Sequence, residues 1–203
     1  MRLDDIPLPQ TAAAQAALEV VREYSSPSLV NHCLRSYIWA VAYGAEHELA
    51  VDTELLYVSA MLHDIGLTGA FDNVTEPFED AGANVAWVFG AGAGWPAQRR
   101  VRAGEVIIRH MWDEVDPAVD PEGHLLCIAT GLDISGRNPQ WWSADLRREV
   151  VAAFPRLTLG EEFTGCFEAQ ASRKPESTAA ASVASGLAKR LVANVLDSPD
   201  PGA

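Results

Sequence analysis

The sequence predicts an all-α protein, and three observations support this. Apolar residues recur at three- and four-residue intervals, no stretch sustains the alternation of a strand, and capping residues or prolines stand where helices would begin. With 203 residues, 48% of them apolar, the chain can bury the core of one compact domain. We expect an N-terminal helix and linker over 1–27, the main domain with additional C-terminal helices over 28–196, and a disordered tail over 197–203.

Three helices are expected in the first third of the chain. An alanine-rich helix spans 11–23 and is followed by a serine- and proline-containing break. Ser28 can cap the next helix, which keeps apolar residues at helical spacing as far as Ala45. Asp52 or Thr53 can cap the third helix, whose residues are apolar nearly all round. Such a helix is typical of the centre of a bundle.

The middle of the chain predicts three more helices. Pro77 suits the first turn of a helix that ends at the glycine run 90–94. Another helix starts near Pro96. The acidic, proline-containing loop 113–120 separates it from a helix over 121–134, and the length and composition of this loop permit a lid.

The last quarter of the chain also predicts helices. Ser143 can cap a helix that runs to Ala153. Thr158 and Glu161 have the spacing of a capping box, in which the two side chains bind each other's backbone amides at a helix start. A final helix is expected over 176–196.

Composition limits the classes of partner. A formal net charge of −13 disfavours nucleic-acid polymers and anionic membranes, because both require a basic surface. The first residues are acidic and proline-containing where a signal peptide carries positive charge, and no apolar run is long enough to span a bilayer. We therefore expect a cytoplasmic protein that acts on a small molecule. Its oligomeric state stays open, a homo-oligomer included.

The chain has one pattern that indicates metal chemistry. His63 and Asp64 follow directly on the apolar central helix, just before Gly66, a residue suited to ending a helix. Together with His32 and Asp133 they offer two imidazoles and two carboxylates from three helices. This donor set suits one divalent ion that keeps a position open to water. The alternative is that the histidines are core residues with satisfied hydrogen bonds and that the carboxylates cap helices.

The order of these motifs resembles the HD-domain superfamily of metal-dependent hydrolases. Five segments further resemble its cyanamide-hydratase-like branch, namely 31–35, 62–68, 78–84, 154–156 and 173–176. The resemblance implies an HD-domain-like helical bundle that holds one divalent transition metal, zinc or iron. It also implies the ligands of that metal, which are His32, His63, Asp64 and Asp133.

The resemblance implies a hydratase (a hydro-lyase) or hydrolase that adds metal-activated water to a small nitrile-like substrate, as in the conversion of cyanamide to urea. Asp64, His110 and Glu79 are the predicted catalytic residues. His110 would donate a proton or orient the substrate, and Glu79 would relay a proton. The structural alternatives are a helix-end histidine and a first-turn carboxylate, each favourably placed in the field of its helix.

Four further residues are predicted to bind the substrate. Asn84 and Thr68 can donate hydrogen bonds, Arg35 can bind an anion, and Trp112 can form a wall of the pocket. Three of the four also have a structural interpretation. Asn84 can satisfy backbone groups, Arg35 can pair with a carboxylate near the site, and most tryptophans pack in cores or interfaces.

Other functions remain open. A phosphohydrolase acting on a small nucleotide or phosphate ester needs an arginine directed at the ion, such as Arg35 or Arg109, and residues 67–68 lack the basic residue often found there in phosphohydrolase members. A two-iron oxygenase needs His110 and His124 as further ligands. A non-catalytic, metal-dependent ligand-binding protein would fill the same site without turnover.

Overall fold

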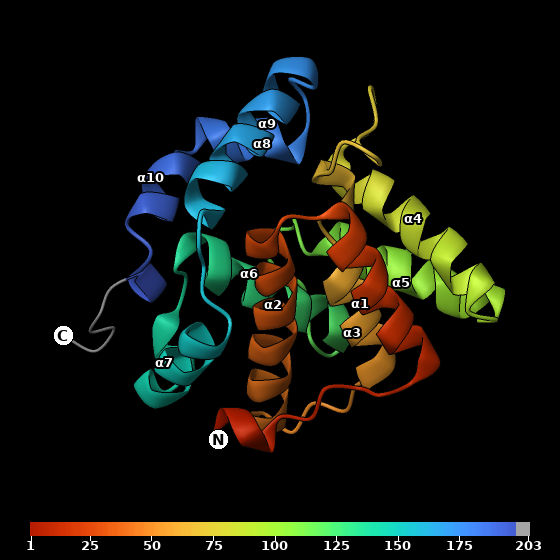
Figure 1. Ribbon diagram of the computed structural model, residues 1–203, viewed down its shortest axis with the longest axis vertical. Helices are drawn as coiled ribbons and strands as arrows, with labels where there is room; N and C mark the ends of the chain where they lie inside the picture. Colours follow the sequence, from red (N-terminus) through yellow and green to blue (C-terminus); the bar gives the residue numbers. More distant parts are fainter. Residues whose placement is uncertain (198–203) are drawn as a thin grey trace.

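The computed structural model describes residues 1–197, which form ten α-helices and no strand (Figure 1). The all-α prediction is therefore confirmed. The helices are α1 (Ala12–Tyr24), α2 (Pro27–Glu46), α3 (Thr53–Leu62), α4 (Phe78–Gly92), α5 (Ala97–Arg109), α6 (Pro121–Ser135), α7 (Ala144–Ala153), α8 (Leu159–Arg173), α9 (Thr178–Ala184) and α10 (Leu187–Val192). Short 3₁₀ turns are η1 (Leu3–Asp5), η2 (Ile65–Leu67), η3 (Pro139–Trp141) and η4 (Val195–Asp197).

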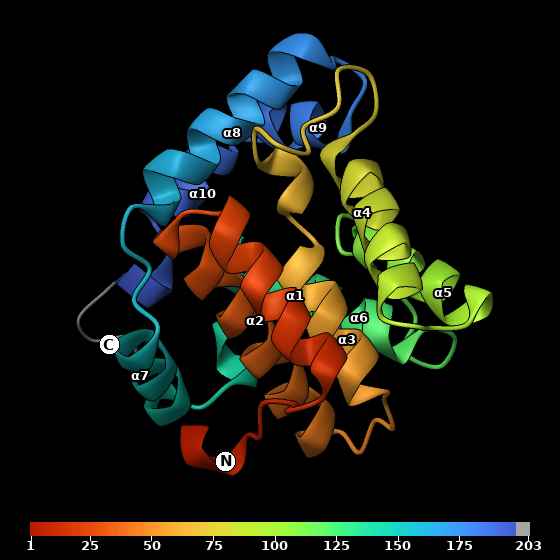
Figure 2. The same ribbon diagram turned by 45° about the vertical axis from the view of Figure 1, so that its right-hand side comes forward.

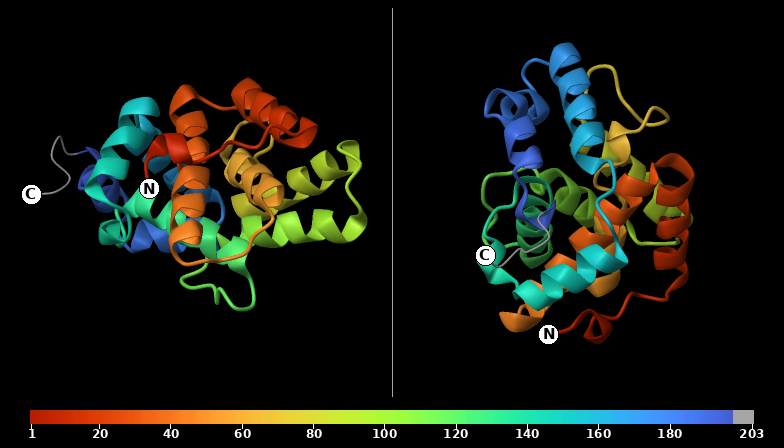
Figure 3. Two further views of the ribbon diagram at one scale, coloured as in Figure 1. Left: turned by 90° about the horizontal axis from the view of Figure 1, so that it is seen from below. Right: turned by 60° about the vertical axis from the view of Figure 1, so that its left-hand side comes forward.

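Helices α2, α3 and α6 occupy the centre of the molecule. Helix α2 packs against both α3 and α6, and α1 covers the outer side of α3. Helices α4 and α5 run side by side as an antiparallel pair that extends away from the rest of the molecule, as the left panel of Figure 3 shows. This pair packs against the central bundle through α3 and α6, so it closes one side of the core.

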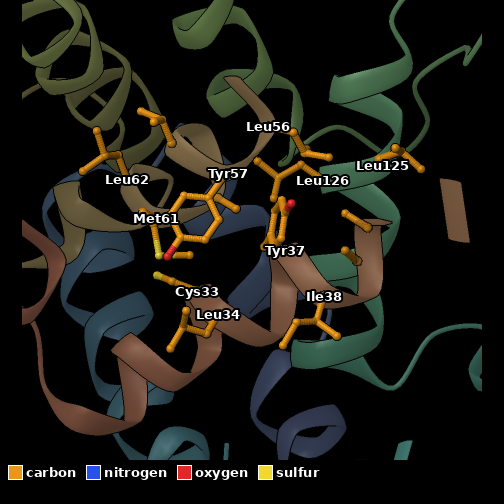
Figure 4. Packing of buried hydrophobic residues seen from close by; sticks show 14 of the residues in the cluster. Cys33, Leu34, Tyr37, Ile38, Leu56, Tyr57, Met61, Leu62, Leu125 and Leu126 are labelled. Atoms are coloured by element: carbon orange, nitrogen blue, oxygen red, sulfur yellow. The ribbon is translucent and has the colours of Figure 1, made fainter. Parts of the chain in front are cut away.

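The main core is filled by side chains from the three central helices. Figure 4 shows Leu34 and Ile38 of α2 packed among α3 and α6 side chains. The rings of Tyr37 and Tyr57 meet edge to face, with 4.9 Å between their centroids. Residues 55–62 of α3 are all buried, which matches its apolar sequence. Because this helix is buried on every side, it delivers the residues at its end into the protein interior.

The start of α2 differs from the prediction. Ser26, and not Ser28, caps the helix, since its hydroxyl accepts a hydrogen bond from the amide of Leu29 at 3.1 Å. Pro27 takes the first helical position, where its missing amide hydrogen costs nothing. The hydroxyl of Ser28 instead donates to the carboxylate of Glu162, and so ties α2 to α8.

The predicted bounds of α4 are also corrected. Pro77 precedes the helix instead of lying in its first turn, and the helix continues through Gly90 to Gly92. The chain reverses at Gly94, whose φ of +75° favours glycine. Gly90 serves close packing, because a Cβ there would lie 3.2 Å from the ring of Trp95. The glycine run therefore permits both the turn and the approach of the next helix.

The C-terminal helices differ most from expectation. The single helix predicted over 176–196 is divided into α9, α10 and η4, because Gly186 adopts a φ of +86° between the first two. The capping box predicted for Thr158 and Glu161 is wrong, since the Thr158 side chain makes no capping hydrogen bond at the start of α8. Other predicted caps are present, because Asp52 and Ser143 accept bonds from the first turns of α3 and α7.

Helices α8, α9 and α10 form a second layer with its own small core. Phe163 and Phe167 of α8 pack with Leu187 of α10 and with apolar residues at the ends of central elements, such as Ile134. Figure 2 shows the loop before α4 running beside α8 and α9, and its Asp72 accepts a hydrogen bond from Gln170 of α8 at 2.8 Å. The layer therefore covers the end of the bundle at which His63 lies.

The predicted tail falls mostly outside the described residues, which end at Asp197. Asp197 itself belongs to η4, and its carboxylate accepts a hydrogen bond from Nε of Arg156 at 2.7 Å, so the predicted disorder is wrong for this residue. Within residues 1–197, no helix is both long enough and apolar enough to cross a membrane.

Candidate metal centre

Three polar side chains converge in the interior, at the junction of the two layers. His32 comes from the second turn of α2, and His63 and Asp64 come from the turn that follows α3. Nε2 of His32 lies 3.1 Å from Nε2 of His63, and Oδ2 of Asp64 lies 3.2 Å and 3.1 Å from these two atoms. All three residues are buried, and they form a group that could hold a metal ion.

The local fold explains why these residues meet. Helix α3 ends at Leu62, and the backbone then turns through His63 and Asp64 into η2. Gly66 lies in this turn directly beneath the start of α4. A Cβ on Gly66 would lie 2.1 Å from the backbone oxygen of Phe78, so only glycine permits this approach. The helix end predicted here is confirmed.

The hydrogen bond that each histidine makes through Nδ1 shows which ring nitrogen carries a hydrogen. Nδ1 of His63 lies 2.8 Å from the carbonyl oxygen of Ala60, which can only accept, so Nδ1 carries the hydrogen. Nδ1 of His32 lies 2.6 Å from Oδ2 of Asp133. Burial alone would raise the pKa of Asp133, but the Arg35 guanidinium holds that pKa well below its ordinary value, so the carboxylate is ionised and accepts. Nε2 is therefore the nitrogen of each ring that faces the other two residues and can bind a metal.

The geometry and the charge of the group fit a divalent metal. Ligand atoms bound at 2.0–2.2 Å to one ion are separated by about 2.8–3.6 Å for ligand–metal–ligand angles between about 90° and 109°, and the three distances between His32, His63 and Asp64 are 3.1–3.2 Å. Within residues 1–197, neither carboxylate oxygen of Asp64 has a hydrogen-bond partner, although both are buried. Lone pairs this close repel one another, and a cation among them removes the repulsion. The nitrogen and oxygen donors suit zinc or iron.

Asp64 is ionised in this setting. Burial alone would raise its pKa, but the neighbouring His63 and His32 hold the pKa of Asp64 well below its ordinary value. Two imidazoles and one carboxylate are a common donor set for catalytic metal sites that leave a position open to water.

Asp133, the fourth predicted ligand, stands apart from these three. It lies behind His32, on the Nδ1 side of the ring. Its oxygens also accept hydrogen bonds from Nε and Nη2 of Arg35, at 2.8 Å and 2.7 Å, and from Nε1 of Trp39 at 3.0 Å. In this arrangement Asp133 orients the His32 ring through Nδ1, a role that carboxylates often have behind metal-bound histidines.

A cavity of about 380 Å³ adjoins the group. Its buried end is lined by His32, His63, Asp64 and His110, and its exposed end by residues that include Trp112 and Asp113. Because residues of the bundle and of α8 to α10 both line it, the cavity lies between the two layers. His32, His63 and Asp64, here called the metal-binding group because they could hold a metal ion, are therefore open to a small molecule from one side.

His110 lies beside the group without joining it. Its Nδ1 donates to the carbonyl oxygen of Ile107, which leaves a lone pair on Nε2, and this atom lies 3.7 Å from Oδ1 of Asp64. Its ring meets that of His63 edge to face. Burial and the neighbouring His63 lower the pKa of His110 to about 3, so its imidazole is neutral at physiological pH. It is placed to exchange a proton with a molecule in the cavity.

Arg35 and Glu79 do not line the cavity. Arg35 is fully buried and uses its donors on Asp133 and on the carbonyl oxygen of Phe154, so the predicted carboxylate pairing is present. One oxygen of Glu79 accepts a hydrogen bond from the Thr178 hydroxyl at 2.5 Å and joins α4 to α9. Burial raises the pKa of Glu79. Its catalytic role stays a prediction.

The other predicted substrate-binding residues divide into two groups. Trp112 lines the cavity, with 49% of its surface exposed. Thr68 and Asn84 do not line it, since the Thr68 hydroxyl donates to the carbonyl oxygen of Ile65 at 2.8 Å and the Asn84 amide donates to Glu76 at 3.1 Å. The Asn84 contact is with a carboxylate and not with the backbone groups of its structural interpretation, and the substrate-binding roles of both residues stay predictions.

Two residues named for the alternative functions lie away from the group of His32, His63 and Asp64. His124 lines a separate cavity of about 250 Å³, and its Nδ1 donates to the carbonyl oxygen of Val115, so it does not join His110 near the metal-binding group. Arg109 donates to Asp120 at 2.5 Å and does not line the main cavity.

The structure adds cavity residues that the sequence did not single out. Most come from the C-terminal layer or from the end of α6, and they include Arg137, Phe163, Phe167, Ser182, Leu187 and Arg190. The spacing of Phe163 and Phe167 places both on one face of α8, which was a usable signal for a buried wall. No sequence pattern indicated that this face would lie over the metal-binding group.

The fold and the site define an all-α protein with a candidate centre for one divalent metal beside an internal cavity. No protein-family model matches the sequence. The chain is 30% identical over 198 residues to cyanamide hydratase DDI2 and to cyanamide hydratase DDI3 of Saccharomyces cerevisiae, over 93% of this chain and 85% of each relative. The chain belongs to the cyanamide hydratase family.

Proposed function

We propose that the protein is an HD-domain metal-dependent hydratase that adds water to a cyanamide-type nitrile. The observation that carries the proposal is the convergence of His32, His63 and Asp64 at 3.1–3.2 Å beside a cavity. The names of the two yeast relatives support the choice of substrate class. In the reaction, the water oxygen bonds to the nitrile carbon, both water protons end on nitrogen, and no atom leaves, so cyanamide becomes urea.

His32, His63 and Asp64 would hold one divalent transition metal, zinc or iron, with Asp133 orienting His32 from behind. When bound, such an ion supplies Lewis acidity and lowers the pKa of water toward 7. Asp64 brings one negative charge to the site and leaves Oδ1 facing His110. The protein's contribution is therefore a fixed donor set in a buried position.

His110 is the residue best placed to move the proton. Since Nδ1 carries a hydrogen bound to Ile107, Nε2 is the atom that accepts a proton from the attacking water and returns it to the nitrile nitrogen. The sequence predicted His110 as a proton donor. In this proposal the residue first accepts a proton and then donates it. The apolar ring of Phe78 lies edge to face against His110 and holds its orientation.

The experiment that tests the proposal is a comparison of two reactions. Purified wild-type protein is assayed for urea formation from cyanamide and for hydrolysis of p-nitrophenyl phosphate, with Asp64→Ala as the control. Urea formation that is absent in Asp64→Ala supports the hydratase. Phosphate release without urea formation would favour the phosphohydrolase instead, and neither activity would favour the non-catalytic binding protein.

A further inference from the structure

The cavity is much larger than cyanamide. Cyanamide has three non-hydrogen atoms and occupies about the space of two or three water molecules, each with a share of about 30 Å³. The cavity of about 380 Å³ falls in the range of pockets that enclose far larger ligands, about 300–1,000 Å³. A molecule that fills it must extend from the metal-binding group well beyond the nitrile.

Two arginines line this cavity without a carboxylate partner. Within residues 1–197, Arg190 donates only to the backbone and hydroxyl oxygens of Ser185, at 2.6 Å and 3.1 Å, and the side chain of Arg137 has no hydrogen bond or ion pair. The Arg137 guanidinium lies against Gly131, where a Cβ would lie 3.1 Å from Nε. The cavity therefore presents two guanidinium groups whose charge no protein carboxylate neutralises directly.

This arrangement is unusual in so acidic a chain. The formal net charge is −13, and most other arginines of the described part bind carboxylates, namely Arg2, Arg35, Arg99, Arg102, Arg109, Arg148, Arg156 and Arg173. The carboxylates that share the cavity are Asp64, which belongs to the metal-binding group, and Asp113 at the exposed end. Arg137 and Arg190 thus remain available to an anion that enters with the substrate.

The same cavity has an apolar wall. The rings of Phe163 and Phe167 stack at 4.7 Å between centroids, and Leu187 and Ile134 pack with them. Such a wall favours an apolar or aromatic body over a chain of polar groups. The lining therefore combines a metal-binding group, an apolar wall and two cations.

We propose that the physiological substrate is an N-substituted cyanamide whose apolar substituent ends in a carboxylate, and that Arg137 and Arg190 select it. The nitrile end of this assignment rests on the proposed function, whereas the preference for a carboxylate rests on the cavity lining alone. Guanidinium groups bind carboxylates through paired, charge-assisted hydrogen bonds, so both arginines contribute to specificity.

The test compares two ligands that differ by one charge. 4-Ureidobenzoate is the hydration product of an aromatic cyanamide with a terminal carboxylate, and phenylurea is its neutral counterpart. Their dissociation constants are measured by calorimetry on the full chain as purified, at low and high salt. The proteins are wild type, Arg137→Gln, Arg190→Gln, the double variant, and Lys189→Gln as the control that removes a charge from an exposed position of the same helix.

We expect wild type and Lys189→Gln to bind 4-ureidobenzoate about tenfold tighter than phenylurea, the order expected for one charge-assisted contact. Each single arginine variant should reduce this preference, and the double variant should bind the two ligands within about twofold of each other. Equal binding of the two ligands by wild type, binding of neither, or a preference that survives in the double variant would overturn the proposal.

The outcome separates the two proposals, because binding is measured without turnover. An arginine-dependent preference in a protein that forms no urea from cyanamide would leave the carboxylate assignment standing and reject the hydratase. Urea formation by a protein without this preference would reject the carboxylate assignment alone.

Discussion

His32 donates a hydrogen bond from Nδ1 to Oδ2 of Asp133 over 2.6 Å, and this bond turns Nε2 toward His63 and Asp64. Asp133 is itself fixed by Arg35, which is fully buried. A buried ion pair therefore determines the orientation of a candidate metal-binding nitrogen. The roles of His32 and Asp133 can be tested separately, because His32 faces the proposed ion and Asp133 lies behind the His32 ring.

Replacing Asp133 should weaken metal binding without abolishing it. Asp133→Asn keeps the size of the side chain but removes the charge that orients His32, and partners of this kind are worth about 10–100-fold in metal affinity. Titration with a competing chelator measures the change, on protein whose helical circular dichroism shows that it is folded. A complete loss of metal, equal to that in Asp64→Ala, would instead make Asp133 a ligand.

Replacing His110 should slow turnover and leave the metal in place. His110→Gln removes the atom that moves the proton, and a positioned acid or base contributes about 10²–10⁴-fold to a rate. The measurement is kcat for urea formation, with metal content determined on the same preparation. His47→Gln is the control, since His47 is exposed and stacks on Tyr43. Loss of metal from His110→Gln would show that His110 is a ligand.

The turn that presents His63 and Asp64 should be sensitive to one methyl group. Gly66→Ala places a Cβ within 2.1 Å of the backbone of Phe78, so α4 must move. We expect a loss of about 1–3 kcal/mol in the free energy of unfolding, together with weaker metal binding. Chemical denaturation measures the first effect. Gly69→Ala is the matched control, because a Cβ there meets nothing within 4 Å, and an equal effect of both substitutions would contradict this account.

The helices of the bundle could be predicted because their caps and apolar periodicity are local. Asp52 and Ser143 cap helices where the sequence indicates, and the helix that ends at Leu62 is buried on all sides, as its composition predicts. Local patterns also have limits. Gly186, with φ of +86°, divides a segment whose composition suits one long helix, and the only local signal of the break is the dipeptide Ser185-Gly186 itself.

The metal-binding group was predictable from residue type, and its surroundings were not. His32, His63 and Asp64 meet as expected, but the place of Asp133 behind a ring depends on side-chain geometry that spacing does not specify. The sequence did not predict that Arg137 and Arg190 line the cavity, for a related reason. Arg190 lies in the last turn of a short helix, and its access to the site depends on how the C-terminal layer packs over the bundle.

A buried ion cluster between α5 and α6 should make stability depend on pH. Burial alone would raise the pKa of Asp120, but hydrogen bonds from Arg102 and Arg109 hold this pKa below its ordinary value. The carboxylate therefore contributes stability that is fully present above about pH 4, the unfolded pKa, and is lost as the pH falls through the lower folded value.

Asp120→Asn should accordingly destabilise the protein at pH 7 by about 1–3 kcal/mol, because both arginines lose a charged partner. The difference from wild type should shrink as the pH falls below 4. Urea denaturation from pH 7 to pH 3 measures it. Glu105→Gln is the control, since its carboxylate is more exposed and lies 3.7 Å and 3.9 Å from the same arginines. A constant difference across the range would contradict the assignment.

The central claim is that His32, His63 and Asp64 hold one divalent transition metal. Plasma mass spectrometry on wild type and Asp64→Ala, purified in parallel without added metal, tests it most directly. The account predicts close to one zinc or iron per wild-type chain and a loss of that metal in the folded variant, because Asp64 supplies the charged ligand. Full metal content in Asp64→Ala, or no metal in the wild type, would contradict it and return these residues to a structural role.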